Sequence, residues 1–233
     1  MHPSEAKSHT AWQVPIAKWV AWGCDPAQAQ TAPDLAYIEP LLRRRLSPLA
    51  RAALHAAHAC SRHCRSVRMV YASRHGELSR TIEALRNLAR GEVLSPTTFS
   101  LSVLNSAAGI FSIARRDEAP ATAISAGLET FGFGLLEALT RARLAPGTPV
   151  LYVYADAPAP PPLDRQTNDP IGPIALAMLI DGANGDILET TMQPSDGPAS
   201  NEPQALACLA ALKGTTTRWT SGHRQWQWGM RSL

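Results

Sequence analysis

The stretch from Gly91 to Leu139, GEVLSPTTFSLSVLNSAAGIFSIARRDEAPATAISAGLETFGFGLLEAL, decides the fold of this chain. It predicts a helix that opens at Ser95-Pro96, a short apolar strand over 120–126, a tight turn, and a second helix over 130–143. A strand that leads through a tight turn into a helix presents the nucleophile in acyl-transfer enzymes. The stretch contains no cysteine. It therefore has the frame of an acyl-transfer site without a thiol.

The remaining segments alternate between strand and helix patterns. Apolar or alternating runs predict strands over 14–22, 67–73, 149–155, 174–181 and 186–192, and apolar residues at helical spacing predict helices over 48–64, 76–90 and 202–212. Strands that are apolar throughout are typical of a sheet with helices on both faces. We therefore predict an α/β fold with a mixed, mostly parallel sheet covered by helices. Its last two strands form an antiparallel pair joined by 182–185.

A single domain over 1–233 accounts for this pattern, because 233 residues suffice for one large core and no internal repeat is visible. The proline-rich segment 156–173 predicts a surface loop. The segment 214–233 predicts a basic, tryptophan-rich tail. We expect its tryptophans to pack on the domain or on a partner, since tryptophan and arginine commonly anchor interfaces.

Composition narrows the class of protein. The formal net charge of +3 is too small to favour nucleic acid as a partner. No apolar run is long enough to span a bilayer, and the amino terminus lacks the apolar core of a signal peptide. The four cysteines follow no disulfide framework. We therefore expect free thiols, a cytoplasmic location and no membrane span.

Several short motifs form a combination that is more specific than any one of them. SPTTF at 95–99 is followed by Asn105, by AAG at 107–109 and by the strand ATAISAG at 121–127, and SRHGELSRT precedes them at 73–81. Together they resemble the amino-terminal half of β-ketoacyl synthases, which implies a thiolase-like half fold. Within that family they are similar to the shortened chain-length-factor type of aryl polyene and xanthomonadin pigment clusters. The resemblance extends over essentially the whole chain.

This resemblance also implies what the chain lacks. Active synthases carry a cysteine just after this strand, at the start of the next helix, where the helix dipole stabilises a thiolate. The matching turn holds Gly127, Leu128 and Glu129, and neither leucine nor an exposed glutamate forms a thioester. Synthases also use two histidines, or a histidine and an asparagine, from a carboxy-terminal half without a counterpart here. We therefore expect a subunit with no catalytic residue, no cofactor and no metal.

The resemblance further implies a partner. A degenerate copy would pair with an active ketosynthase and shape the acyl cavity, while the growing chain arrives on an acyl carrier protein. The Arg-rich segment 43–68 would offer that acidic carrier a basic surface, although a solvated helix face has the same composition. Candidates for the tunnel wall or the dimer interface are Phe99, Leu104, Asn105, Phe111, Phe131 and Phe133. Apolar residues at helical spacing are also typical of plain core.

Two other functions fit parts of the sequence. His75 follows a strand, and with Asp156 and a serine such as Ser102 or Ser125 it would suggest a small acyl hydrolase or transferase. No G-x-S-x-G elbow supports that hypothesis, and His75 also fits a simple helix start. The third hypothesis is a structural protein that self-associates into a homodimer around an empty relic site.

Two further groupings have structural explanations. Cys60 and Cys64 lie one helical turn apart near His58 and His63, but helix-spaced cysteines are usually buried small hydrophobes rather than zinc ligands. The glycines at 127, 132 and 134 do not fit a phosphate-binding loop. We expect them to let the turn and the following helix pack closely against a strand or a partner.

Overall fold

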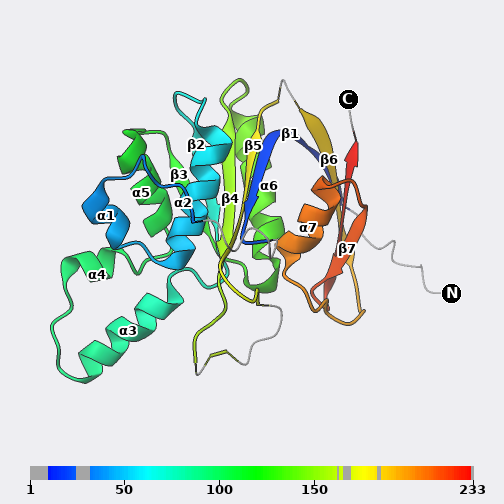
Figure 1. Ribbon diagram of the computed structural model, residues 1–233. Helices are drawn as coiled ribbons and strands as arrows, with labels where there is room; N and C mark the ends of the chain where they lie inside the picture. Colours follow the sequence, from blue (N-terminus) through cyan, green and yellow to red (C-terminus); the bar gives the residue numbers. More distant parts are fainter. Residues whose placement is uncertain (1–9, 25–31, 162, 165–168, 183–184, 232–233) are drawn as a thin grey trace.

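Eight strands form one sheet in the computed structural model, in the order β3-β2-β4-β5-β1-β6-β8-β7 (Figure 1). The structure describes residues 10–24, 32–161, 163–164, 169–182 and 185–231. The strands are β1 (Thr10–Trp22), β2 (Arg68–Ala72), β3 (Ala121–Ile124), β4 (Val150–Asp156), β5 (Ile174–Ile180), β6 (Asp186–Pro194), β7 (Thr217–Thr220) and β8 (Arg224–Arg231). The helices are α1 (Pro40–Arg44), α2 (Pro48–Ser61), α3 (Leu78–Ala89), α4 (Pro96–Ser100), α5 (Ser106–Arg115), α6 (Thr130–Leu144) and α7 (Gln204–Leu212).

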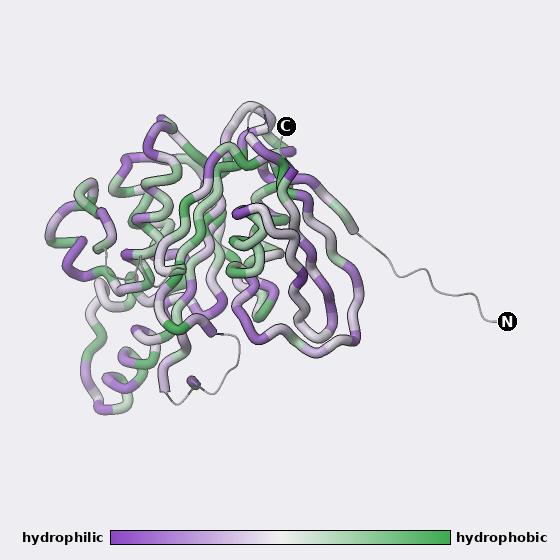
Figure 2. Tube along the Cα trace, turned by 45° about the vertical axis from the view of Figure 1, so that its right-hand side comes forward, coloured by the Kyte–Doolittle hydropathy of each residue, from purple (hydrophilic) through white to green (hydrophobic). Residues whose placement is uncertain are grey.

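Helices cover both faces of the part of the sheet built from β2, β4 and β5. On one face α2 and α5 share a core with Met69, Leu151 and Val153, and on the other face α6 packs with Val70 and Tyr152. Neighbouring residues of a strand point to opposite faces, so a strand buried on both faces must be apolar throughout. Figure 2 shows the hydrophobic central strands, with hydrophilic segments toward the outside. The core on the α6 face continues under α7, which packs on β7 and β8.

The predicted α/β class, with its mixed sheet covered by helices, is confirmed. Parallel pairing joins β2 to β3 and to β4, at one end of the sheet. The five other pairs of neighbouring strands in the described residues are antiparallel, which is more antiparallel pairing than the sequence predicted. The parallel strands are those that helices connect, because a parallel pair needs a long crossover.

The expected pairing between the strands at 174–181 and 186–192 is corrected by the structure. β1 lies between β5 and β6 and pairs antiparallel with both, so that Ile180 and Asp186 both face Ile16. The chain must therefore cross over β1 between β5 and β6, next to an irregularity in the register of β1. Gly185 lies at this crossing. The strand pattern alone did not predict it, because β1 comes from the other end of the sequence.

The segment expected to be a tail, 214–233, is also corrected. In its described part it forms β7 and β8, and the last two residues lie outside the described part. Trp219, Trp226 and Trp228 are buried in the core under α7 and α6. The run RQWQW at 224–228 alternates with a period of two, which is the pattern of a strand with one buried face.

The single helix expected from Ser95 onward is divided in two. α4 ends at Ser100 and α5 begins at Ser106. The hydroxyl of Ser102 stabilises the break, because it donates to the Phe99 carbonyl at 2.8 Å and competes with continued helix.

Gly185→Ala should lower the free energy of unfolding by more than about 3 kcal/mol or prevent folding. The added Cβ would lie 2.0 Å from the Ile16 carbonyl oxygen, and the φ of +104° disfavours any other residue. Gly182→Ala is the control, because its added Cβ would meet no atom within 4 Å. Urea denaturation followed by tryptophan fluorescence measures both variants. Equal stabilities would contradict the crossing at Gly185.

Candidate functional site

The carboxyl ends of the three parallel strands lie at one edge of the sheet. The segments that leave them are 73–77 after β2, 125–129 after β3 and 157–173 after β4. In α/β sheets, ligands bind outside these ends, where the loops from neighbouring strands converge. The turn that the sequence singled out is one of these three segments, and the proline-rich segment is another.

The turn after β3 is held by its own polar groups. It is a short 3-10 helix, η2 (Gly127–Glu129), and Gly127 begins it with a left-handed φ of +60°. The Thr130 hydroxyl oxygen accepts from the Ala126 amide at 2.8 Å, and the same hydroxyl donates to the Gly127 carbonyl at 2.7 Å. The connection between β3 and α6 therefore has one defined geometry.

Glu129 closes this turn and is buried, with 7% of its surface exposed, whereas the sequence analysis expected an exposed glutamate. Its Oε2 accepts from the indole Nε1 of Trp226 at 2.9 Å, and its Oε1 accepts from Nη1 of Arg224 at 3.0 Å. Both donors belong to β8. A buried carboxylate is tolerated when it is paired and hydrogen-bonded. Glu129 thereby links the turn after β3 to β8.

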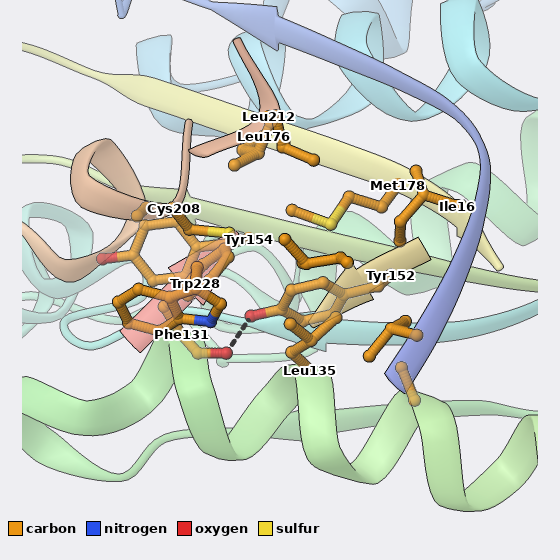
Figure 3. Packing of buried hydrophobic residues seen from close by; sticks show 14 of the residues in the cluster. Ile16, Phe131, Leu135, Tyr152, Tyr154, Leu176, Met178, Cys208, Leu212 and Trp228 are labelled. Carbon is orange, nitrogen blue, oxygen red and sulfur yellow. Dashed lines mark hydrogen bonds between the residues drawn. The ribbon is translucent and has the colours of Figure 1, made fainter. Parts of the chain in front are cut away.

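α6 packs closely against β8 and against β2 and β4. Two of its glycines allow this close approach. A Cβ on Gly132 would lie 2.6 Å from the ring of Trp226, and a Cβ on Gly134 would lie 2.9 Å from Tyr152. The close packing expected of Gly132 and Gly134 is confirmed, whereas a Cβ on Gly127 would meet no atom within 4 Å. Phe131 is fully buried, and its carbonyl accepts from the Tyr152 hydroxyl at 2.7 Å (Figure 3).

Aromatic rings fill the space between α6 and β8. Trp226 and Trp228 stack with their centroids 5.9 Å apart. Phe131 meets Trp228 edge-on at 6.1 Å, and Phe133 meets Trp226 edge-on at 5.4 Å. Figure 3 shows Phe131 and Trp228 side by side in this core. Edge-on and offset pairs add to the stability from burial alone, so this cluster fixes β8 and with it the partners of Glu129.

The four thiols lie elsewhere and are poor nucleophiles. Burial raises the pKa of Cys24 to about 11 and that of Cys60 to about 12. Burial also raises the pKa values of Cys64 and Cys208. The four cysteines are free thiols. Because the thiolate is the reactive form, a thiol with a raised pKa reacts slowly at neutral pH.

A second polar network joins the ends of β2 and β4. Oδ1 of Asp169 lies 3.0 Å from Nη1 of Arg74 and 2.8 Å from Nε2 of His75, and Oδ2 accepts from the Ala159 amide at 3.0 Å. Asp156 is buried and accepts from the His75 amide at 3.2 Å, and burial raises the pKa of its carboxyl. These contacts anchor the segment that follows β4. Sequence reasoning missed Asp169, because an aspartate within a proline-rich segment follows no recognisable pattern.

This geometry does not assemble the serine hydrolase that was weighed as an alternative. A hydrolase of that kind needs a serine hydroxyl within hydrogen-bond reach of the His75 ring. Ser102 and Ser125 instead donate to main-chain carbonyl oxygens. The ring of His75 is hydrogen-bonded to Asp169. Asp156 accepts a hydrogen bond from the main-chain amide of His75 and not from its ring.

Comparisons with known proteins agree with this architecture. The sequence matches the family of β-ketoacyl synthase N-terminal domains over residues 19–229. A chain in the structure of a ketosynthase (ApeO) in complex with its chain length factor (ApeC), from Xenorhabdus doucetiae, is 30% identical. That alignment has a TM-score of 0.77 and covers 94% of this chain and 99% of that chain. The chain belongs to the β-ketoacyl synthase N-terminal domain family.

The predicted thiolase-like half fold is confirmed by the same similarity. A β-ketoacyl synthase from Burkholderia phymatum shows the fold alone, since it is 11% identical with a TM-score of 0.51. The alignment covers 79% of this chain and 56% of that synthase. No curated protein matches the sequence.

The six residues that the resemblance suggested for a tunnel or an interface do not line one cavity. Phe111 and Phe131 lie in the two cores on opposite faces of the sheet. Leu104 and Asn105 border a groove beside β3, and Phe99 is 60% exposed on α4. The last of the six belongs to the aromatic cluster beside β8. The residues at the groove and on α4 therefore stay candidates for an interface.

The cysteines and histidines of α2 make structural contacts. The thiol of Cys60 donates to the Lys18 carbonyl at 3.5 Å, and the ring of His58 stacks on Tyr37 with centroids 3.9 Å apart. Across the described residues, no group of three or more His, Cys, Asp or Glu side chains is placed to hold a metal ion. In the same part of the chain, none of the helices has the length and apolar character that a membrane crossing requires.

Glu129→Ala should lower the free energy of unfolding by about 2–4 kcal/mol, because it leaves the buried indole N–H of Trp226 without an acceptor. Glu137→Ala is the matched control: Glu137 pairs with Arg141 at 2.6 Å on the surface of α6. Loss of such a surface pair costs less than about 1 kcal/mol. Urea denaturation measures both variants, and equal losses would show that Glu129 does not fasten β8.

Proposed function

We propose that the chain is a non-catalytic, chain-length-factor-like subunit that pairs with an active ketosynthase in aryl polyene biosynthesis. The observation that carries this proposal is the pair of hydrogen bonds that Trp226 and Arg224 donate to Glu129. The resemblance implies that this carboxylate lies in the turn at which active synthases hold a thiolate. One oxygen is engaged by the buried indole of Trp226 and the other by the exposed guanidinium of Arg224, and a carboxylate cannot form the thioester that chain extension needs. The chain would therefore contribute shape and contact rather than bonds.

The similarity to a chain of a ketosynthase–chain length factor complex supports this proposal. The alignment with the Xenorhabdus chain covers nearly all of both partners, so the two chains have almost the same length. The Burkholderia synthase is longer, because this chain spans 56% of it.

The edge of the sheet offers a place for such a partner. β3 is the end strand, so one row of its amide and carbonyl groups faces away from the sheet. A groove of about 410 Å³ runs beside it. The groove is lined by Leu104, Asn105, Ala108, Gly109, Ser112, Ala121, Thr122 and Ala123. A strand of the ketosynthase would bury this groove and extend the sheet at β3.

The helices α3 and α4 extend the same surface. They project from the side of the molecule on which β3 and α5 lie (Figure 1). Large apolar side chains are exposed there: Leu85, Leu88, Phe99 and, at 96%, Val93. Contiguous exposed apolar groups mark sites of protein contact. In the proposed complex the ketosynthase covers them, and their bulk limits the acyl cavity.

The acyl carrier protein would approach the complex from the basic side. Arg44, Arg45, Arg86 and Arg90 are exposed around α1 and α3. An acidic carrier is attracted to such a surface by long-range steering, and the attraction weakens as salt rises. This role completes the proposal of a subunit that acts through contacts alone.

Co-expression with an aryl polyene ketosynthase should give a 1:1 complex that survives size-exclusion chromatography with light scattering. Gly109→Trp should weaken the complex at least about tenfold, because it fills the groove with a large side chain. The substitution has room, since a Cβ on Gly109 meets no atom within 4 Å. Gly182→Trp is the control, with equally open space away from the groove.

Three outcomes would contradict the proposed function. One is the absence of any complex with the ketosynthase, and another is a homodimer that excludes the ketosynthase. The third is a complex that Gly109→Trp and Gly182→Trp weaken to the same extent. Circular dichroism of each variant confirms that it is folded before binding is compared.

A further inference from the structure

A small hollow at the carboxyl ends of β2 and β4 has no part in the turn or in the groove beside β3. It has a volume of about 210 Å³ and lies between the starts of α2 and α3 and the segment that follows β4. Its apolar walls are Pro48, Leu49, Leu78, Ala157, Pro158 and Pro173. Hollows outside the carboxyl ends of parallel strands are the usual ligand sites of α/β sheets.

One carboxylate is built into this apolar hollow. Glu77 is buried at its wall, where Oε1 accepts from the Ser47 hydroxyl at 2.7 Å and Oε2 lies 3.3 Å from Nε of Arg80. The guanidinium neutralises the carboxylate. A carboxylate has about four lone-pair sites, so Glu77 has acceptor capacity for one more donor. Such a donor would come from a molecule in the hollow.

The walls of the hollow are fixed before any ligand enters. Asp169 holds the segment after β4 through Arg74, His75 and the Ala159 amide. Ala157 and Pro158, on the same segment, therefore keep their places in the wall. A preformed site loses little entropy when it binds a small ligand.

We infer that this hollow binds a single uncharged aromatic ring that carries a hydroxyl group, with the hydroxyl donating to Glu77. A cavity of about 150 Å³ holds benzene, so 210 Å³ fits one substituted ring. An uncharged ligand is favoured because Glu77 is paired with Arg80 and Asp169 is paired with Arg74 and His75. To identify this ring with the aryl end of a growing polyene rests on the proposed function, whereas the binding does not.

The test uses the full-length chain alone and three simple probes: p-cresol, toluene and benzylammonium. Titrations followed by NMR chemical shifts give the affinities. We expect p-cresol to bind at least about tenfold more tightly than toluene, because only p-cresol donates a charge-assisted hydrogen bond. Benzylammonium should bind more weakly than p-cresol, since the charge of Glu77 is already paired.

Three variants locate the site. Ser79→Trp, in the first turn of α3, should block the hollow and abolish binding of p-cresol, whereas Leu85→Trp, on the same helix outside the hollow, should leave it unchanged. Glu77→Gln keeps an acceptor for Ser47 but loses the charge, so it should reduce the preference for p-cresol over toluene to about threefold or less.

The inference is overturned by equal affinities for p-cresol and toluene, by binding that survives Ser79→Trp, or by no saturable binding of p-cresol. None of these results depends on a ketosynthase. Failure of this test therefore leaves the proposed complex standing, and failure of the complex leaves the hollow to be judged on the probes alone.

Discussion

The bond between Glu129 and the two β8 side chains, Trp226 and Arg224, is the interaction on which the rest of the structure depends. It joins the turn after β3 to β8, the last strand in the sequence, at the point where α6 begins. The carboxylate is buried, so it stays in place only while both donors reach it. Gly132 lets β8 approach α6, and the stacked indoles hold β8 in position. These contacts join β8 to the turn after β3 and to α6.

The sequence predicted those elements whose residues follow a regular strand or helix pattern. The apolar run of β4 and the uncharged first half of α6 matched the structure closely, because burial on all sides leaves a direct trace in composition. The glycines of α6 also predicted close approach. What the patterns missed depends on partners far away in the chain: β1 between β5 and β6, the burial of Glu129, and the anchor at Asp169. The alternation at 224–228 was a strand signal, hidden by the basic composition around it.

Under the proposed function, a site of chemistry has become a structural joint. The resemblance implies that an active synthase has an accessible nucleophile at the start of the helix that corresponds to α6. Here the same geometry presents a carboxylate inward, toward β8, and the helix that would stabilise a thiolate is enclosed by aromatic rings. The free edge at β3 and the exposed apolar groups of α3 and α4 give the chain its contact surface. Shape and contact are then the whole contribution of this subunit.

Intact-mass spectrometry of the complex after incubation with an acyl-loaded carrier protein tests the central claim most directly. The account predicts that the ketosynthase gains the mass of the acyl group and that this chain keeps its own mass. An acyl adduct on this chain would contradict the account if hydroxylamine releases it, because hydroxylamine cleaves thioesters.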